Sequence, residues 1–170
     1  DLAARWQEDV IDLRPDVLSV FVGTNYAERH LGRLLRADDP KTVPDFDFAD
    51  WERTYRGLLD QARQANPALK IVLCTPFAAP CGKIVEGALG EYYPLRQRIL
   101  AQCCVIVERI AADYGATLVP FHRLIADLET RLPNGDATYW VWDGIHPTPA
   151  GQRLMADCWI GAAARSGVME

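Results

Sequence analysis

The chain has 170 residues, 49% of them hydrophobic, so it can bury one full core and is expected to form a single domain over residues 1–170. Its formal net charge at pH 7 is −5, and acidic and basic residues are interspersed without a basic stripe, which argues against a nucleic-acid partner. No run of 18 apolar residues occurs, so no membrane span is expected.

Apolar spacing and chain breakers divide the sequence into alternating segments. In chain order they predict a helix over 2–13, a strand over 17–22, a helix over 48–65, a strand over 71–75, a helix over 93–114, a strand over 117–120, and helices over 124–132 and 149–164. The strand over 17–22 is expected to be buried. Residues 24–47, with Pro40 and Pro44, and residues 76–90 are expected to be irregular.

Strands that alternate with helices across connections this long predict an α/β fold with a parallel sheet covered on both faces. Such sheets bind their ligands at the carboxyl ends of the strands. Asn25 and Thr75 follow strands closely, and Asp143 and His146 lie in the loop before the last helix. We therefore expect these side chains to meet at one edge of the sheet. A flavodoxin-like nucleotide binder is disfavoured, because no Gly-rich phosphate loop follows any strand.

The five cysteines are an odd number, and Cys103 and Cys104 are neighbours within a helical pattern. Adjacent helical cysteines are poorly placed to bridge to each other, so buried thiols and a reducing, cytoplasmic setting are favoured over a disulfide scaffold. No visible signal peptide precedes the first helical pattern. No CxxC or HExxH spacing occurs, and neither a metal ion nor an organic cofactor is implied.

The most informative motif is the segment 142–151, which reads Trp-Asp-Gly-Ile-His-Pro-Thr-Pro-Ala-Gly. In such a turn Asp143 accepts the proton of one ring nitrogen of His146, and the other nitrogen is left as a base for a nucleophile. The structural alternative is an Asp-Gly turn whose histidine merely caps a helix. The flanking Gly144, Pro147 and Gly151 favour the catalytic interpretation.

Asn25 ends the segment Val22-Gly23-Thr24-Asn25 after the first predicted strand. A side-chain amide in this place can donate to an oxyanion, although asparagine is also simply favoured in turns. Beside the Asp–His pair, Tyr139, Trp140 and Trp142 form an aromatic group on which a sugar ring could stack. Core packing explains any one of them equally well, but three together favour a carbohydrate ester.

None of the hydroxyl or thiol side chains is well placed as a nucleophile. Ser19 is expected to be buried in the middle of a strand, and Ser166 lies beyond the last helix. Cys74 and Thr75 end a strand nearer to the expected site, but a thiol in an apolar strand is usually inert.

The remaining histidines and a run of aspartates are expected to be structural. His30 falls in the predicted loop near Asp38 and Asp39, where a solvated side chain is favoured over a metal ligand, and His122 is expected to have a structural role. The acidic residues before the helix over 48–65 are expected to cap its N-terminus; they are Asp45, Asp47 and Asp50.

The two segments 17–25 and 142–151 together resemble the third and fifth sequence blocks of the SGNH hydrolases, also called GDSL-type esterases. In that family a Ser, a Gly and an Asn act with an Asp-x-x-His pair on a three-layer α/β/α sandwich of flavodoxin-like type. The resemblance implies that Asn25 is an oxyanion-hole donor, that His146 is the general base and that Asp143 orients it. Candidate substrate-binding residues are Trp142, Trp140 and Tyr26.

The chain departs from the family pattern in two ways. The Gly-Asp-Ser block, which ends the family's first strand, and the block with the oxyanion Gly do not occur here. In relatives both lie upstream of a helix like the one over 2–13, so the domain is expected to be N-terminally incomplete and to lack the first strand. The family usually has Asp after the Asn, where this chain has Tyr26, so the hydrogen bonding of that loop is expected to differ.

The resemblance implies a carboxylic ester hydrolase that works through an acyl-enzyme. The segment 139–151 is most similar to bacterial members that deacetylate xylan and related sugars, so a carbohydrate acetyl ester is the preferred substrate. The alternatives are a lysophospholipase or thioesterase with the same machinery, and a non-catalytic, truncated module. Without a usable serine, the 170 residues alone are expected to be inactive, and an exposed sheet edge is expected to favour homo-oligomers.

Overall fold

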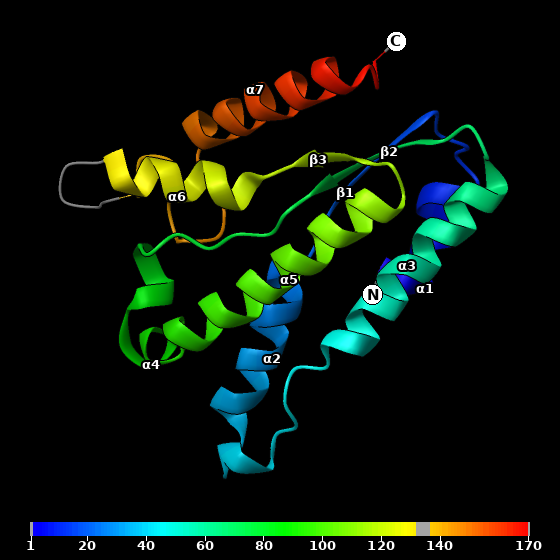
Figure 1. Ribbon diagram of the computed structural model, residues 1–170. Helices are drawn as coiled ribbons and strands as arrows, with labels where there is room; N and C mark the ends of the chain where they lie inside the picture. Colours follow the sequence, from blue (N-terminus) through cyan, green and yellow to red (C-terminus); the bar gives the residue numbers. More distant parts are fainter. Residues whose placement is uncertain (1, 132–136, 170) are drawn as a thin grey trace.

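The computed structural model describes residues 2–131 and 137–169, and a three-stranded parallel sheet lies at its centre (Figure 1). The strands are β1 (Val17–Phe21), β2 (Lys70–Cys74) and β3 (Thr117–Val119), in the order β1-β2-β3. Leu18 pairs with Ile71, and Leu73 pairs with Leu118. The parallel sheet expected from the alternation of elements is confirmed, and all three carboxyl ends share one edge.

Helices cover both faces of the sheet, as the resemblance implied (Figure 1). One face packs against α3 (Phe48–Ala65) and α5 (Tyr93–Asp113), and the other packs against α6 (Phe121–Arg131) and α7 (Pro149–Ser166). Neighbouring strand residues point to opposite faces, so the two cores divide β2 between them. Ile71 and Leu73 belong to the first core, whereas Val72 and Cys74 belong to the second. The fold is a three-layer α/β/α sandwich.

Shorter elements connect these layers. They are α1 (Leu2–Trp6), the π-helical turn η1 (Gln7–Ile11), α2 (Thr24–Arg36), the 3₁₀ turns η2 (Pro40–Thr42) and η3 (Gly82–Val85), and α4 (Gly87–Glu91). The predicted helix over 2–13 is thus an α-helical turn followed by a π-helical one, closed by a bond of 2.9 Å from the Asp12 amide to the Gln7 carbonyl. The helix predicted over 124–132 begins earlier, at Phe121, and its predicted last residue lies outside the described residues.

The prediction that residues 24–47 are irregular is wrong for its first half, which forms α2. This helix buries only Ala27 and Leu31, but with Leu34 and Leu35 they recur at helical spacing, a signal that the prediction of an irregular segment missed. The helix packs against α5. His30 therefore lies on a helix and not in a loop.

The expectation that β1 is buried throughout is also wrong. Leu18 and Val20 are buried, but Ser19 and Phe21 are exposed on the opposite face of the strand. Within the described residues β1 pairs only with β2, and α7 packs over β3, at the other side of the sheet. The outer edge of β1 therefore has free backbone groups, and association of copies through it stays a prediction.

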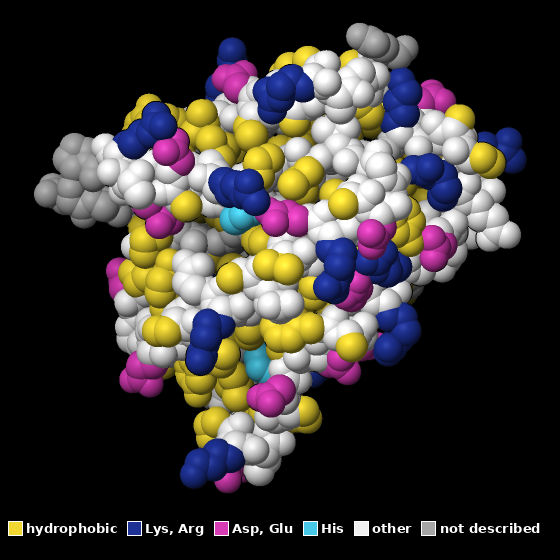
Figure 2. All heavy atoms as spheres, viewed as in Figure 1, with side chains coloured by type: hydrophobic (Ala, Val, Ile, Leu, Met, Phe, Trp, Pro, Cys, Tyr) yellow, Lys and Arg dark blue, Asp and Glu magenta, His cyan; other side chains and the backbone are white. Residues whose placement is uncertain are grey.

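The surface has mixed charge, and Figure 2 shows acidic and basic side chains scattered over one face of the molecule without a stripe of one sign. In the part of the chain that the structure describes, no helix is long and apolar enough to cross a bilayer. Among the same residues, no three His, Cys, Asp or Glu side chains converge as a metal site would require.

Candidate active site

The turn before α7 brings Asp143 and His146 into direct contact. His146 Nδ1 lies 2.8 Å from Asp143 Oδ2, while the backbone amides of His146 and Ile145 donate to Asp143 Oδ1 at 2.8 and 3.0 Å. Asp143 is held from within its own turn, with 15% of its side chain exposed, whereas the His146 side chain is 65% exposed. With Nδ1 engaged by Asp143, the Nε2 atom is the nitrogen left for proton transfer.

The protonation state of Asp143 follows from these contacts. Burial alone raises the pKa of Asp143, but the hydrogen bonds from His146 and Ile145 outweigh it, so its pKa lies below the ordinary 3.8. At neutral pH the group is a carboxylate, which only accepts hydrogen bonds. Nδ1 of His146 must then carry the proton, which is the tautomer a general base with a free Nε2 requires.

Glycines let a second segment pack directly against this turn. Gly144 has φ +90°, and a Cβ there would meet Ile84 Cγ1 at 2.4 Å. Across the contact, a Cβ on Gly82 would meet the Asp143 Cα at 2.6 Å. The Ala79 amide donates to the Gly144 carbonyl at 2.8 Å. The segment 79–84 therefore fixes the backbone of Asp143, and larger residues at either glycine would displace it.

The start of α7 fixes the other end of the turn. Thr148 Oγ1 accepts from the Gly151 amide at 3.1 Å and donates to the Tyr139 carbonyl at 2.7 Å, so one side chain caps α7 and ties it to the preceding loop. A Cβ on Gly151 would lie 2.0 Å from the Trp140 carbonyl oxygen. The Gly151 noted in the sequence therefore permits a close approach of α7 to that loop.

Asn25 and His146 line the same open cleft of about 470 Å³, as expected from the shared edge of the sheet. Asn25 is the second residue of α2 and is exposed. Gly23 before it has φ +134°, and a Cβ there would meet Pro76 at 2.7 Å, while Thr24 Oγ1 donates to the Phe77 carbonyl at 3.2 Å. These contacts hold the N-terminus of α2 against the chain that follows β2.

The predicted aromatic group divides into two parts. The Trp142 ring is 55% exposed and stacks on the His146 ring, with centroids 6.1 Å apart and an interplanar angle of 28°. Trp140 is partly buried and packs against the core that lies under α7. Tyr139 is 67% exposed and contacts the Trp140 ring edge-on. Trp142 thus lies beside His146, and substrate binding by Trp142, Trp140 and Tyr26 stays a prediction, with core packing as the alternative for Trp140.

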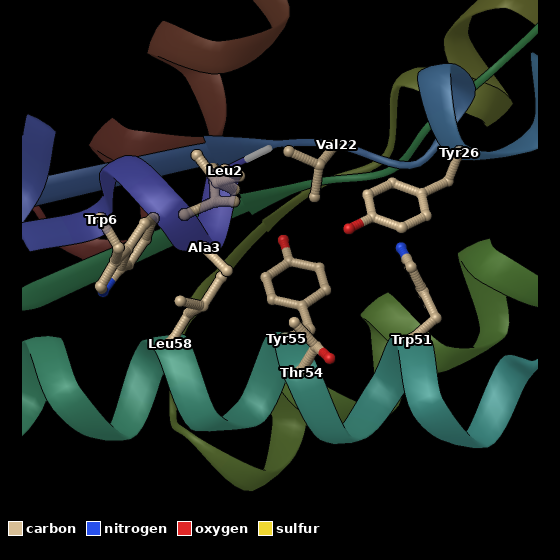
Figure 3. Close-up of a pocket in the computed structure, with 10 residues that line it drawn as sticks. Leu2, Ala3, Trp6, Val22, Tyr26, Trp51, Thr54, Tyr55 and Leu58 are labelled. Atoms are coloured by element: carbon tan, nitrogen blue, oxygen red, sulfur yellow. The ribbon is translucent and has the colours of Figure 1, made fainter. Parts of the chain in front are cut away.

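Tyr26 lines both the cleft and a second, smaller cavity of about 20 Å³, whose other walls come mainly from α1, β1 and α3. Figure 3 shows the hydroxyls of Tyr26 and Tyr55 pointing into this space. Tyr55 is 4% exposed, and its hydroxyl has no hydrogen-bond partner among the described residues. Burial raises the pKa of Tyr55 far above its usual value, so the group stays neutral.

Neither serine lines the cleft that holds His146. Ser19 lies on the exposed side of β1 and accepts from Trp159 Nε1 at 3.1 Å, so its predicted burial is wrong. Ser166 bonds Thr117 Oγ1 at 2.7 Å, at the amino end of β3 and hence at the opposite edge of the sheet. Burial raises the pKa of the Cys74 thiol to about 11, so it is not a thiolate at neutral pH.

The side chains set aside as structural have local partners. Thr75, which was expected to meet Asn25 and His146, does not line their cleft. It is fully buried, and its Oγ1 lies 2.7 Å from His122 Nδ1 and accepts from the His122 amide at 3.2 Å. The His30 ring meets Phe46 edge-on, with centroids 5.8 Å apart. Of the three aspartates predicted to cap α3, Asp47 is the N-cap residue and accepts from the Asp50 amide at 2.8 Å.

A buried ion pair that the sequence reasoning missed joins the two halves of the site. Arg96 is fully buried in α5, and its Nε and one terminal nitrogen donate to Glu28 at 2.5 and 3.1 Å. The other terminal nitrogen donates to the Ile84 carbonyl at 3.2 Å. Glu28 lies on α2, three residues after Asn25, and Ile84 touches Gly144. The sequence contained one signal for the burial of Arg96: it falls at the same helical spacing as the buried residues Ile99, Leu100 and Cys103.

The amino-acid sequence of this chain is similar to those of known proteins. Residues 1–154 match the model of the GDSL-like Lipase/Acylhydrolase family. A curated "Acetylxylan esterase" from Geobacillus stearothermophilus is 31% identical over 163 residues, which cover 94% of this chain and 64% of the relative. The chain therefore spans just under two thirds of that relative's length.

Solved structures agree with this match. A GDSL-like protein from Parabacteroides merdae has a TM-score of 0.77 at 27% identity, over 98% of this chain and 67% of that one. Axe2, an acetylxylan esterase from Geobacillus stearothermophilus, has a TM-score of 0.73 at 25% identity, over 95% of this chain and 65% of that one. The family match, with an Asp–His pair and an asparagine in one cleft of an α/β/α sandwich, shows that this chain belongs to the GDSL-like lipase/acylhydrolase, or SGNH hydrolase, family.

Proposed function

We propose that these residues form the proton-handling and oxyanion-binding part of a carboxylic ester hydrolase that deacetylates a carbohydrate. The observation that carries the proposal is the contact of 2.8 Å between His146 and an ionised Asp143, in the same cleft as Asn25. The family match supports ester hydrolysis, and the names of the acetylxylan esterase relatives support an acetylated sugar.

In the proposed reaction the ester carbonyl carbon is attacked by a serine hydroxyl supplied by a Gly-Asp-Ser block. His146 Nε2 takes the serine proton as the bond to carbon forms, and Asp143 stabilises the imidazolium. The carbonyl oxygen, now an oxyanion, accepts from the Asn25 side-chain amide, a contact whose loss lowers kcat by about 10²–10³-fold in other hydrolases. His146 then gives its proton to the sugar oxygen as the bond between this oxygen and the acyl carbon breaks, which releases the sugar hydroxyl, and water hydrolyses the acyl-enzyme by the same steps.

The surroundings of the pair favour a sugar as the alcohol part of the ester. Trp142 presents an exposed ring beside His146, a surface suited to the apolar face of a sugar. A second candidate, hydrolysis of a lysophospholipid or thioester, is favoured by the apolar side chains in the cleft wall, Leu2, Phe21 and Ile145. The two candidates differ in the acyl length that they accept.

The test compares two proteins on nitrophenyl esters. The 170-residue chain alone is expected to show no turnover of nitrophenyl acetate, because neither of its serines lines the cleft. A protein that joins the Gly-Asp-Ser block to these 170 residues is expected to hydrolyse the acetyl ester, with kcat/KM falling as the acyl chain lengthens. Stopped assays with equal amounts of folded protein give both rates.

Each arm has an outcome that contradicts the proposal. Turnover by the 170-residue chain that disappears in its His146→Ala variant would mean that a residue within the chain is the nucleophile. A kcat/KM that rises from acetyl to long acyl esters would favour the lysophospholipase or thioesterase candidate. Absence of hydrolysis by the protein that contains the Gly-Asp-Ser block would favour a non-catalytic module.

A further inference from the structure

A polar groove of about 300 Å³ runs from the catalytic cleft along α2, between this helix and the segment that leads into α3. Figure 1 shows this segment beside α2. The charged and aromatic residues that define the groove, called here the α2 groove, are Tyr26, Arg29, Arg33, Asp45, Asp47 and Asp50. Tyr26 and Arg29 also line the catalytic cleft, so the two hollows are continuous.

One side of the α2 groove is formed by the face of α2 that also carries Asn25, the proposed oxyanion donor. Asn25, Arg29 and Arg33 are spaced four residues apart on α2 and are all exposed, so they share one face of the helix. Four residues advance an α-helix by about 6 Å, which places Arg33 about 12 Å along the helix from Asn25. If the ester group of a long ligand lies at Asn25 and His146, the rest of the ligand can lie beside Arg29 and Arg33.

The opposite bank carries acceptors. Asp45, Asp47 and Asp50 face the groove from the chain before α3 and from its first turn. Asp47 accepts a hydrogen bond from the Asp50 amide, and the Asp50 carboxylate forms an ion pair with Arg53. For Asp45, Arg29 and Arg33 the described residues provide no ion pair, although Arg33 and Asp45 both act electrostatically on the His30 ring between them. Charged donors and acceptors thus face the same space without neutralising each other.

This distribution of charge selects the chemistry of the ligand. A hydroxyl group both donates and accepts, so a polyol can use the guanidinium groups on one bank and the carboxylates on the other. An anionic ligand would be attracted by Arg29 and Arg33 but repelled by the carboxylates of Asp45 and Asp47, neither of which has an ion pair with a described residue. We propose that the α2 groove binds the uncharged sugar units that flank the acetylated unit of an oligosaccharide. The proposal rests on the carbohydrate substrate of the proposed function. It adds where the remaining sugar units of that substrate bind and that these units are uncharged.

The experiment measures binding and needs no turnover, so the 170-residue chain itself can be used. Neutral xylotetraose is titrated into the chain and into two variants, Arg33→Ala and Asp45→Ala, by calorimetry and by ¹⁵N chemical shifts. Hydrogen bonds to charged groups are worth enough that each variant is expected to raise Kd about tenfold. Arg36→Ala is the matched control, because Arg36 is exposed on the same helix and does not line the groove.

Further outcomes separate this proposal from the proposed function. Tetragalacturonate, an acidic chain of the same length, is expected to bind more weakly than xylotetraose. Tighter binding of the acidic chain, absence of xylotetraose binding, or equal Kd values for wild type and both groove variants would each overturn the assignment. If xylotetraose binds through the groove while the protein with the Gly-Asp-Ser block releases no acetate from acetylated xylotetraose, the ester hydrolase proposal fails and the groove assignment stands.

Discussion

The His146→Ala variant of a protein that carries the Gly-Asp-Ser block is expected to hydrolyse nitrophenyl acetate with kcat reduced by about 10⁴-fold or more. His146 is the only described histidine that lines the cleft with Asn25, and its Nδ1 is held by an ionised carboxylate. Without the imidazole, the serine loses its proton acceptor and the leaving alcohol loses its proton donor. KM is expected to change little, because the ring acts mainly in the transition state.

The matched control for this prediction is His122→Gln. His122 contacts the buried Thr75 and does not line the cleft, and a glutamine can keep a hydrogen bond to the Thr75 hydroxyl. Initial rates over a range of ester concentrations give kcat and KM for both variants, and circular dichroism checks that they are folded. A His146→Ala enzyme within tenfold of wild type would show that another group is the base.

Arg96→Met is expected to lower the free energy of unfolding by about 3–5 kcal/mol, the loss typical when one partner of a buried ion pair is removed. Arg96 is fully buried, and the Glu28 side chain is only 25% exposed, so the Glu28 carboxylate would be left largely buried without its cationic partner. The Ile84 carbonyl would lose its donor as well. Because Glu28 lies on α2 and Ile84 supports Gly144, catalysis is also expected to suffer in the active protein.

Urea unfolding followed by circular dichroism measures this effect. Arg98→Met is the control, since Arg98 is exposed two residues away on the same helix and has no ion pair with a described residue; a change within about 0.5 kcal/mol is expected. Replacing Glu28 and Arg96 together by Met is expected to recover part of the loss, because no charge is then left buried. A loss below about 1 kcal/mol for Arg96→Met alone would contradict the role of the pair.

Much of the fold was predictable because it depends on regular spacing of apolar residues. The segment 48–65 carries Trp51, Tyr55, Leu58 and Leu59 at helical spacing, and its predicted bounds are those of α3. The three short apolar runs are the three strands. The Asp143–His146 contact was predictable from four residues, because the hydrogen bonds of the Asp143 carboxylate all come from its own turn.

Other features arise only when distant segments pack together. Ser19 looked buried because its neighbours are apolar, but the position of β1 at the outer side of the sheet leaves its alternate side chains exposed. The Arg96–Glu28 pair joins residues 68 positions apart, and neither segment by itself indicates that the other contains its partner. The α2 groove likewise needs Arg33 and Asp45 to face each other across a turn that was expected to be irregular.

The tautomer of His146 in the 170-residue chain is the measurement that tests the central claim most directly. In protein labelled with ¹⁵N at histidine, we expect the neutral His146 ring to show an Nδ1 signal of a protonated nitrogen and an Nε2 signal of an unprotonated one, because the Asp143 carboxylate can only accept. In Asp143→Asn the preference is expected to weaken or reverse. A wild-type ring protonated at Nε2 instead, or a ring unchanged by Asp143→Asn, would contradict the assignment of His146 as a base oriented by Asp143.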